Sequence, residues 1–136
     1  YKTSDSRHIS VGAIEDKFYL EFITKLDLKL DQLPNRTDKS NWPKLKEIFQ
    51  EIIKTKTMRE WEKIYFGTDA CVAPVLNFEE AFVDPHNKYR GIFPKAFNII
   101  QPKPAPDLSV TPAPKISDKH KIKLTEAEVF SQWGIN

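Results

Sequence analysis

Ser10-Val-Gly-Ala-Ile-Glu-Asp-Lys-Phe18 is the stretch in which a strand pattern gives way to a helix pattern. Apolar and polar residues alternate over residues 9–13, which is typical of a half-buried strand. Over residues 16–28 apolar side chains recur at the spacing of an amphipathic helix. Glu15 lies at the junction, where regular backbone on both sides would fix a side chain that remains accessible. The stretch therefore predicts an α+β fold and a candidate functional carboxylate at Glu15.

The composition is that of a folded domain and gives no indication of a nucleic-acid or membrane partner. Of the 136 residues, 40% are hydrophobic and 12% are aromatic, which is unlike a disordered chain. Lys and Arg (21) are interleaved with Asp and Glu (19), so neither nucleic acid nor an acidic membrane surface is expected as a partner. No apolar run approaches the roughly 20 residues of a membrane-spanning helix.

The start of the chain and its cysteine content suggest part of a longer protein from a reducing compartment. The chain begins at Tyr1, without Met or a signal peptide and shortly before a predicted strand, so we expect it to be a piece of a longer protein. Cys71 is the single cysteine, which precludes an internal disulfide. Its apolar neighbours predict a buried, unreactive thiol.

Capping patterns and helical spacing predict the elements that follow the first helix. Ser40 or Asn41 is expected to cap a second helix, with Pro43 in its first turn. The remaining predicted elements are a third helix opened by a capping box at 57–60 and ended by Gly67, a buried strand over 71–76, and a short helix over 77–83.

The character of the chain changes after Gly91. Residues 92–100 are strand-like but interrupted by Pro94, and prolines then crowd residues 102–114. Prolines at this density fix φ and remove hydrogen-bond donors, so this segment is expected to run extended along a surface. Composition leaves open whether it is a flexible linker or a strap returning to another domain. A capping box at 125–128 predicts a final short helix.

Apart from Glu15, few residues form a pattern of chemical interest. The three histidines are far apart and none has a Cys or His at ligand spacing, so no metal site is predicted. We expect His8 at the surface, His86 in a loop and His120 in a solvated basic segment over 115–123. The four glycines do not form a phosphate-binding loop. By spacing alone, Glu15 is an ordinary glutamate near a helix start, where the helix dipole favours it.

A series of short motifs covers most of the chain up to about Thr111. In order, they are Tyr1-Lys-Thr-Ser-Asp5, Val11-Gly-Ala-Ile-Glu15 with Phe18, Trp42-Pro43, Gly67-Thr-Asp-Ala-Cys-Val72 with Pro74-Val75, His86-Asn87, Arg90-Gly91 with Phe93, and Gln101-Pro-Lys-Pro-Ala-Pro106. Their order and approximate spacing resemble the C-terminal part of the α-methylacyl-CoA racemase family, within the class III CoA-transferase superfamily. Formyl-CoA-type transferases tend to carry Gly-Asn-Asp at the junction, so Ala13-Ile-Glu15 favours the racemases.

The resemblance implies the small α+β domain of the class III CoA-transferase fold over residues 1–91. Residues 92–136 would be an extended Pro-rich return segment and a C-terminal helix that dock on a large domain outside this chain. It also implies an interlocked homodimer acting on a 2-methyl-branched acyl-CoA in branched-chain fatty acid metabolism, in mitochondria or peroxisomes. The catalytic His and Asp would lie upstream of Tyr1, so we expect this chain to be inactive by itself.

The resemblance further implies roles for two residues. Glu15 would be an accessory catalytic residue that pairs with the catalytic His of the partner chain, and Ile14 would line the acyl pocket. Because the substrate is a CoA thioester, we expect no cofactor, and we assign no CoA-binding residue or metal ligand to this chain. Asp16-Lys17 departs from the Pro-Gln often seen in the family and should alter the helix start without moving the carboxylate. Two alternatives stay open: a class III CoA-transferase, and a non-enzymatic dimerisation or partner-binding module.

Overall fold

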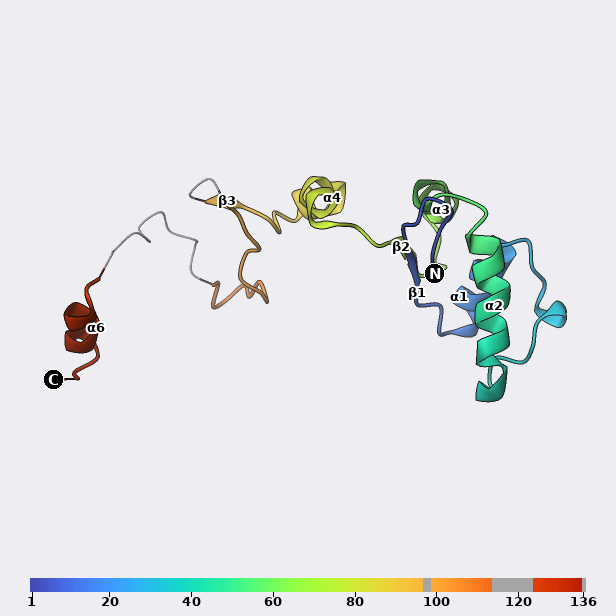
Figure 1. The fold of residues 1–136 in the computed structure, drawn as a ribbon, viewed down its shortest axis with the longest axis horizontal. Helices are drawn as coiled ribbons and strands as arrows, with labels where there is room; N and C mark the ends of the chain where they lie inside the picture. Colours follow the sequence, from blue (N-terminus) through green and yellow to red (C-terminus); the bar gives the residue numbers. More distant parts are fainter. Residues whose placement is uncertain (97–98, 114–123, 136) are drawn as a thin grey trace. The chain divides into compact units, whose positions relative to one another are not determined.

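The computed structural model describes residues 1–96, 99–113 and 124–135 (Figure 1). The chain divides into two compact units, Tyr1–Leu76 and Asn77–Asn136, which are described separately below. Helices and short antiparallel strands occur together, which confirms the predicted α+β class. The boundary predicted after Gly91 separates a small domain from a segment that would dock on a large domain outside this chain, and it stays a prediction. Within this chain the boundary between the two compact units lies earlier, after Leu76.

The first unit pairs two short strands and packs three α-helices. Strand β1 (Ile9–Val11) runs antiparallel to β2 (Val72–Pro74), with Ile9 opposite Pro74 and Val11 opposite Val72. The helices are α1 (Asp16–Thr24), α2 (Trp42–Ile53) and α3 (Met58–Tyr65), and two 3₁₀ turns, η1 (Leu30–Gln32) and η2 (Lys39–Asn41), lie between α1 and α2.

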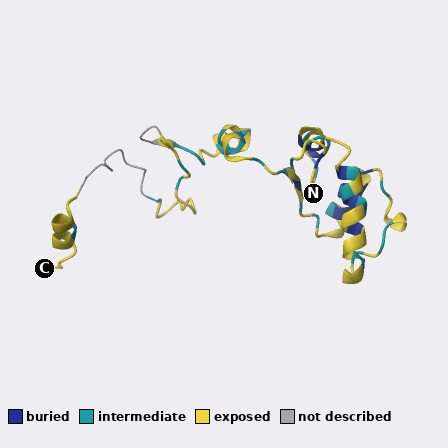
Figure 2. Ribbon diagram, viewed as in Figure 1, coloured by how far each residue is buried: buried dark blue, intermediate teal, exposed yellow. Residues whose placement is uncertain are grey.

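Large apolar side chains from all three helices form the core of this unit (Figure 2). Phe22, Ile53 and Trp61 are almost fully buried. The Trp61 indole donates to the Ile53 carbonyl at 2.7 Å, and the Tyr65 hydroxyl donates to the Phe22 carbonyl at 3.1 Å. The Phe22 and Phe49 rings meet edge to face with centroids 5.1 Å apart. The polar atoms of these aromatic residues are therefore satisfied inside the core.

Helix α1 ends earlier than the predicted range of 16–28. The amides of Leu26 and Leu28 each donate to the Ile23 carbonyl at 3.0 Å, and Asp27 adopts a left-handed φ of 58°. This is a Schellman-type ending, in which a left-handed residue usually supplied by glycine reverses the chain. Leu26 stays buried after the helix has ended, so its apolar spacing reflects packing and not helix length.

The capping prediction for α2 is wrong in its detail, although Pro43 does lie in the first turn. Asn41 occupies the cap position without a side-chain capping bond, and its amide group donates instead to the Asn35 carbonyl at 3.0 Å. The capping bond lies earlier, where the Asp38 carboxylate accepts from the Ser40 amide at 2.9 Å. The 3₁₀ turn η2 therefore separates the capping residue from the helix.

The third helix begins and ends as predicted. Glu60 accepts from the Thr57 amide at 2.7 Å, and Thr57 accepts from the Glu60 amide at 3.3 Å, which completes the capping box. Gly67 follows with a φ of 73°, in the left-handed region that favours glycine.

The predicted strand after α3 forms, but the expectation for its cysteine is wrong. Strand β2 is shorter than the predicted range of 71–76, and Cys71 is exposed, not buried. Its φ of 52° places a left-handed turn immediately before β2, and its thiol lies 3.4 Å from the Asp69 carbonyl. The exposure of Cys71 therefore follows from the backbone turn at this residue and not from the polarity of its neighbours.

The second unit contains short elements. These are α4 (Phe78–Val83), α5 (Pro85–Tyr89), β3 (Lys95–Ala96), β4 (Ile99–Ile100) and α6 (Glu126–Gln132), with β3 and β4 paired antiparallel. The capping box predicted at Thr125 is confirmed, and the short helix predicted over 77–83 forms and opens at Asn77 with a capping box of its own. His120 and the basic run 115–123 lie outside the described residues.

Helix α5 was not predicted and holds one of the candidate residues. Asp84 accepts from the Asn87 amide at 2.9 Å, and Pro85 occupies the first turn. His86 therefore lies on a short helix and not in the expected loop. A capping Asp followed by Pro was the available signal.

Asp5 joins the first turn of the chain to α3. Its carboxylate accepts from the hydroxyl of buried Thr3 at 2.5 Å and from the Met58 amide at 3.3 Å. The Thr3 hydroxyl, with smaller contributions from the Met58 and Arg7 amides, holds the pKa of Asp5 below its ordinary value of 3.8. Because the lowered pKa belongs to the folded state, this contribution to stability is present above the ordinary pKa and is lost as the pH falls through the lowered one.

We therefore expect Asp5→Asn to lower the free energy of unfolding at pH 7 and to flatten its decline as the pH falls below the ordinary Asp pKa of 3.8. Urea unfolding at a series of pH values measures both effects. Asp31→Asn, at an exposed aspartate outside this cluster, is the control and should keep the wild-type slope. An Asp5→Asn curve parallel to that of the wild type would contradict the assignment.

Candidate functional site

The junction between β1 and α1 is held by backbone hydrogen bonds. The Gly12 amide donates to the Cys71 carbonyl and the Ile14 amide donates to the Gly12 carbonyl, each at 2.9 Å. The second bond closes a γ-turn around Ala13. Glu15 takes the N-cap position of α1 in extended conformation, with φ −71° and ψ 148°. The sequence prediction that Glu15 lies at a strand-to-helix junction is confirmed.

The Glu15 side chain is exposed and makes no capping hydrogen bond. Over the described parts of the chain it has no hydrogen-bond or ion-pair partner. Ile14, immediately before it, is 79% exposed, which is high for a large apolar side chain beside a carboxylate. The structure thus presents both predicted site residues outward from a fixed backbone, and their roles toward a substrate and a partner histidine stay predictions.

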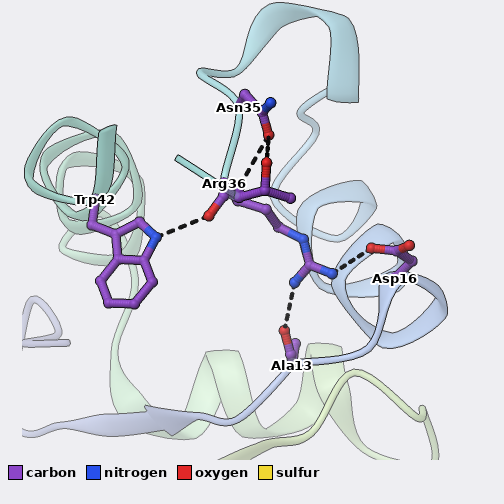
Figure 3. A network of polar contacts seen from close by, with 6 residues as sticks. Ala13, Asp16, Asn35, Arg36 and Trp42 are labelled. Carbon is purple, nitrogen blue, oxygen red and sulfur yellow. Dashed lines mark hydrogen bonds and ion pairs between the residues drawn. The ribbon is translucent and has the colours of Figure 1, made fainter. Parts of the chain in front are cut away.

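Arg36 holds the junction from a separate loop (Figure 3). Its Nη1 donates to the Ala13 carbonyl at 3.4 Å, and its Nη2 forms an ion pair with Asp16. The guanidinium lies over the Tyr19 ring, with the carbon 4.4 Å from the ring centroid. Arg36 therefore contacts this segment at three points. These are Ala13, which precedes the cap residue, Asp16, which is the first residue of α1, and Tyr19, which lies one turn into the helix. Residues 14 and 15 lie between its first two contacts.

The loop that carries Arg36 is itself ordered by local hydrogen bonds. The Trp42 indole donates to the Arg36 carbonyl at 2.9 Å, as Figure 3 shows. The Asn35 side chain accepts from the amide and the hydroxyl of Thr37, at 3.0 and 2.9 Å. Sequence reasoning missed Arg36 because it treated this segment only as a polar loop. An Asn two residues before a Thr suggests a side-chain-stabilised turn, but no pattern shows which distant residues the arginine reaches.

An open apolar groove of about 520 Å³ lies beside the junction. Residues of the junction, α1 and α2 line it, including Val11, Ile14, Tyr19, Trp42, Leu45 and Phe49. The basic side chains of Arg36 and Lys46 also contribute to its lining. The structure thus places Ile14 against an apolar hollow, as a residue expected to line an acyl pocket would require. From the sequence, no role at this groove was assigned to Leu45 or Phe49, and Trp42 was named only as part of a family motif.

Tyr19 contributes a buried hydroxyl beside this groove. Its side chain is 6% exposed, and the hydroxyl has no hydrogen-bond partner among the described residues. Burial raises the pKa of Tyr19, while the nearby charge of Arg36 opposes that rise. A buried hydroxyl without a partner is destabilising.

The other chemistry-bearing residues do not join the junction. His8 is exposed, as expected for a surface residue, and pairs with Lys2 in an isolated antiparallel β-bridge. His86 belongs to the second unit. Across residues 1–96, 99–113 and 124–135, no group of three or more His, Cys, Asp or Glu side chains could hold a metal ion. Over the same ranges, every helix is too short or too polar to cross a membrane.

Comparison with known proteins identifies the family. The model of CoA-transferase family III matches residues 1–120, and the chain belongs to this family. It is 46% identical over 138 residues to alpha-methylacyl-CoA racemase of Homo sapiens and 39% identical over 138 residues to that of Mus musculus. Both matches cover 100% of this chain and 36% of the relative, so the chain spans about a third of their length.

A more distant relative also carries a CoA-transferase family name. A CaiB/baiF CoA-transferase family protein of Caenorhabditis elegans is 35% identical over 80 residues, which is 59% of this chain and 22% of the relative. The resemblance to the racemases and the class III CoA-transferases is therefore confirmed.

The two buried tyrosines allow a paired test of the unpartnered hydroxyl. We expect Tyr19→Phe to leave the free energy of unfolding unchanged or to raise it by about 1 kcal/mol, because no hydrogen bond is lost. Tyr65→Phe is the matched variant and should lower it by about 1–2 kcal/mol, since it removes the bond to Phe22. Urea unfolding of both variants measures the difference. A loss at Tyr19 as large as that at Tyr65 would show that the Tyr19 hydroxyl has a partner.

Proposed function

We propose that the intact protein containing this chain is a 2-methylacyl-CoA racemase. It would interconvert (R)- and (S)-2-methylacyl-CoA by removing and returning the α-proton, in branched-chain fatty acid metabolism. Family membership and the identity to two racemases support this proposal. The structural observation that carries it is Glu15, an unpaired carboxylate on a rigid junction next to an exposed Ile14 and an apolar groove.

Under this proposal the chain supplies supporting groups and not the proton-transfer groups. The His and Asp that exchange the α-proton would lie in the remainder of the protein. Glu15 would accept a hydrogen bond from one ring nitrogen of that His, on the partner chain of an interlocked homodimer. Such a bond fixes the tautomer and orientation of the ring and raises the basicity of its other nitrogen. Ile14 would contact the acyl chain.

Proton exchange at the α-carbon of a thioester requires no cofactor, because the thioester carbonyl itself accepts the developing charge. We accordingly propose a CoA thioester as substrate and no further cofactor. We also propose a mitochondrial or peroxisomal location, in keeping with branched-chain fatty acid metabolism.

The activity is tested by incubating the intact protein with (R)-2-methylacyl-CoA in D₂O. We expect epimerisation at C2 together with incorporation of deuterium, and no reaction with the 136-residue chain by itself. An intact protein that neither epimerises nor exchanges the α-proton would overturn the proposed activity. Racemisation by this chain by itself would overturn the assignment of the proton-transfer groups to the rest of the protein.

Glu15→Gln in the intact protein separates an accessory role from a structural one. We expect turnover to fall by about 10- to 100-fold with little change in KM, because the amide cannot orient and polarise a histidine as a carboxylate does. Glu47→Gln, at an exposed glutamate paired with Lys44 on α2, is the control and should keep wild-type turnover. Unchanged turnover in Glu15→Gln would show that Glu15 has no accessory role in the reaction and serves only as the N-cap residue of α1.

A class III CoA-transferase is the second candidate function. The family model and the Caenorhabditis elegans relative carry the CoA-transferase name, which supports it at family level. An assay of the intact protein with an acyl-CoA donor and a free acceptor acid distinguishes the two. Transfer of CoA to the acceptor without epimerisation at C2 would favour the transferase.

A further inference from the structure

Arg36 touches three points that surround Glu15 in the chain. Its two terminal nitrogens reach the Ala13 carbonyl and the Asp16 carboxylate, and its planar group covers the Tyr19 ring. Ala13 precedes Ile14 and Glu15, and Asp16 follows them directly. One rigid group from another loop thus holds both ends of the segment that carries the predicted site residues.

We propose that Arg36 is a positioning residue for the reaction, setting the direction in which Ile14 and Glu15 leave the junction. The proposal rests on the proposed racemase function. Under this proposal Arg36 acts through the residues on either side of Glu15, Ala13 and Asp16, and not on the reacting histidine directly.

The exposure of the contacts indicates a local role and not a general stabilising one. Asp16 is 92% exposed in its side chain, and an ion pair to such a carboxylate adds little to overall stability. The Arg36 side chain, by contrast, is 24% exposed, and its backbone carbonyl is fixed by the Trp42 indole. Arg36 is therefore the fixed partner in these contacts, and the junction between β1 and α1 is the segment that it restrains.

The geometry requires a guanidinium. Its fork of donors lies in one plane, so the two acceptors are held at a fixed separation while the flat face packs on an aromatic ring. A lysine in the same place is a single point charge on a flexible stem and cannot maintain these contacts together. Since Glu15 makes no capping bond of its own, the remaining restraints on the junction are its backbone bonds, the packing of its neighbours and Arg36.

Arg36→Lys in the intact protein is the principal test, because it keeps the charge and most of the stem. We expect turnover to fall about tenfold with little change in KM, as for other small displacements of a catalytic constellation. Arg59→Lys, which alters an arginine paired with Glu62 on α3, is the matched control and should keep wild-type kinetics.

Combining the substitution with Glu15→Gln distinguishes positioning from structural damage. If Arg36 acts through Glu15, then Arg36→Lys lowers turnover in the wild type but adds no further loss in the Glu15→Gln background. An equal loss in both backgrounds, or wild-type turnover in Arg36→Lys, would overturn the proposal.

Hydrogen–deuterium exchange of the intact protein gives a readout that does not depend on activity. We expect faster exchange in Arg36→Lys over peptides covering residues 12–19, and unchanged exchange over α3. A wild-type protein without racemase activity would contradict the proposed function, and the exchange measurement then decides whether Arg36 holds the junction. Unchanged exchange over residues 12–19 would overturn the proposal whatever the activity.

Discussion

Pairing between β1 and β2 holds the backbone from which the junction departs. The register places Ile9 opposite Pro74 and Val11 opposite Val72, and the Gly12 amide extends the contact to the Cys71 carbonyl at 2.9 Å. The two strands come from opposite ends of the first unit, so their pairing also closes it. Two paired strands of this length are not stable in isolation. Their order must come from the helices that pack with them.

The aromatic core supplies that order and anchors the junction on both sides. Ile9 precedes the junction and is almost fully buried, and Phe22 lies in the same core one helix turn beyond Tyr19. The Phe22 ring packs against the rings of Phe49 and Tyr65, with centroid distances of 5.1 and 6.0 Å. A segment fixed by buried residues at each end has few conformations available, so its exposed side chains are held in a limited range of directions.

Local patterns predicted the elements well where capping and packing agree. The capping box at Thr57 and Glu60 satisfies its own backbone, so four residues of sequence suffice to predict it. The end of α1 could not be predicted in the same way, because Asp27 adopts the left-handed conformation that usually signals glycine. Cys71 was misjudged for a similar reason, since its burial depends on a backbone turn and not on the polarity of its neighbours.

The candidate site likewise contains residues that local patterns predict and a residue that they do not. Glu15 and Ile14 could be selected from the sequence because they follow a strand pattern and belong to a family motif. Arg36 could not, because its contacts with Ala13 and Asp16 join segments separated by a loop and depend on the path of that loop. Local patterns predict which elements form; they do not predict which side chain of a loop reaches another element.

The helix starts of this chain show how Glu15 differs from most other capping residues. In the described part of the chain, capping side chains accept a backbone amide at four α-helices, namely those of Thr57, Asn77, Asp84 and Thr125, and at the 3₁₀ turn η2, through Asp38. Glu15 occupies the same position at α1 without such a bond, as does Asn41 at α2, but the Asn41 side chain bonds to the Asn35 carbonyl instead. A short polar cap there would add about 1 kcal/mol to stability. Glutamate forgoes that gain and leaves a carboxylate on a fixed backbone, which supports the proposal that its hydrogen-bond partner lies outside this chain.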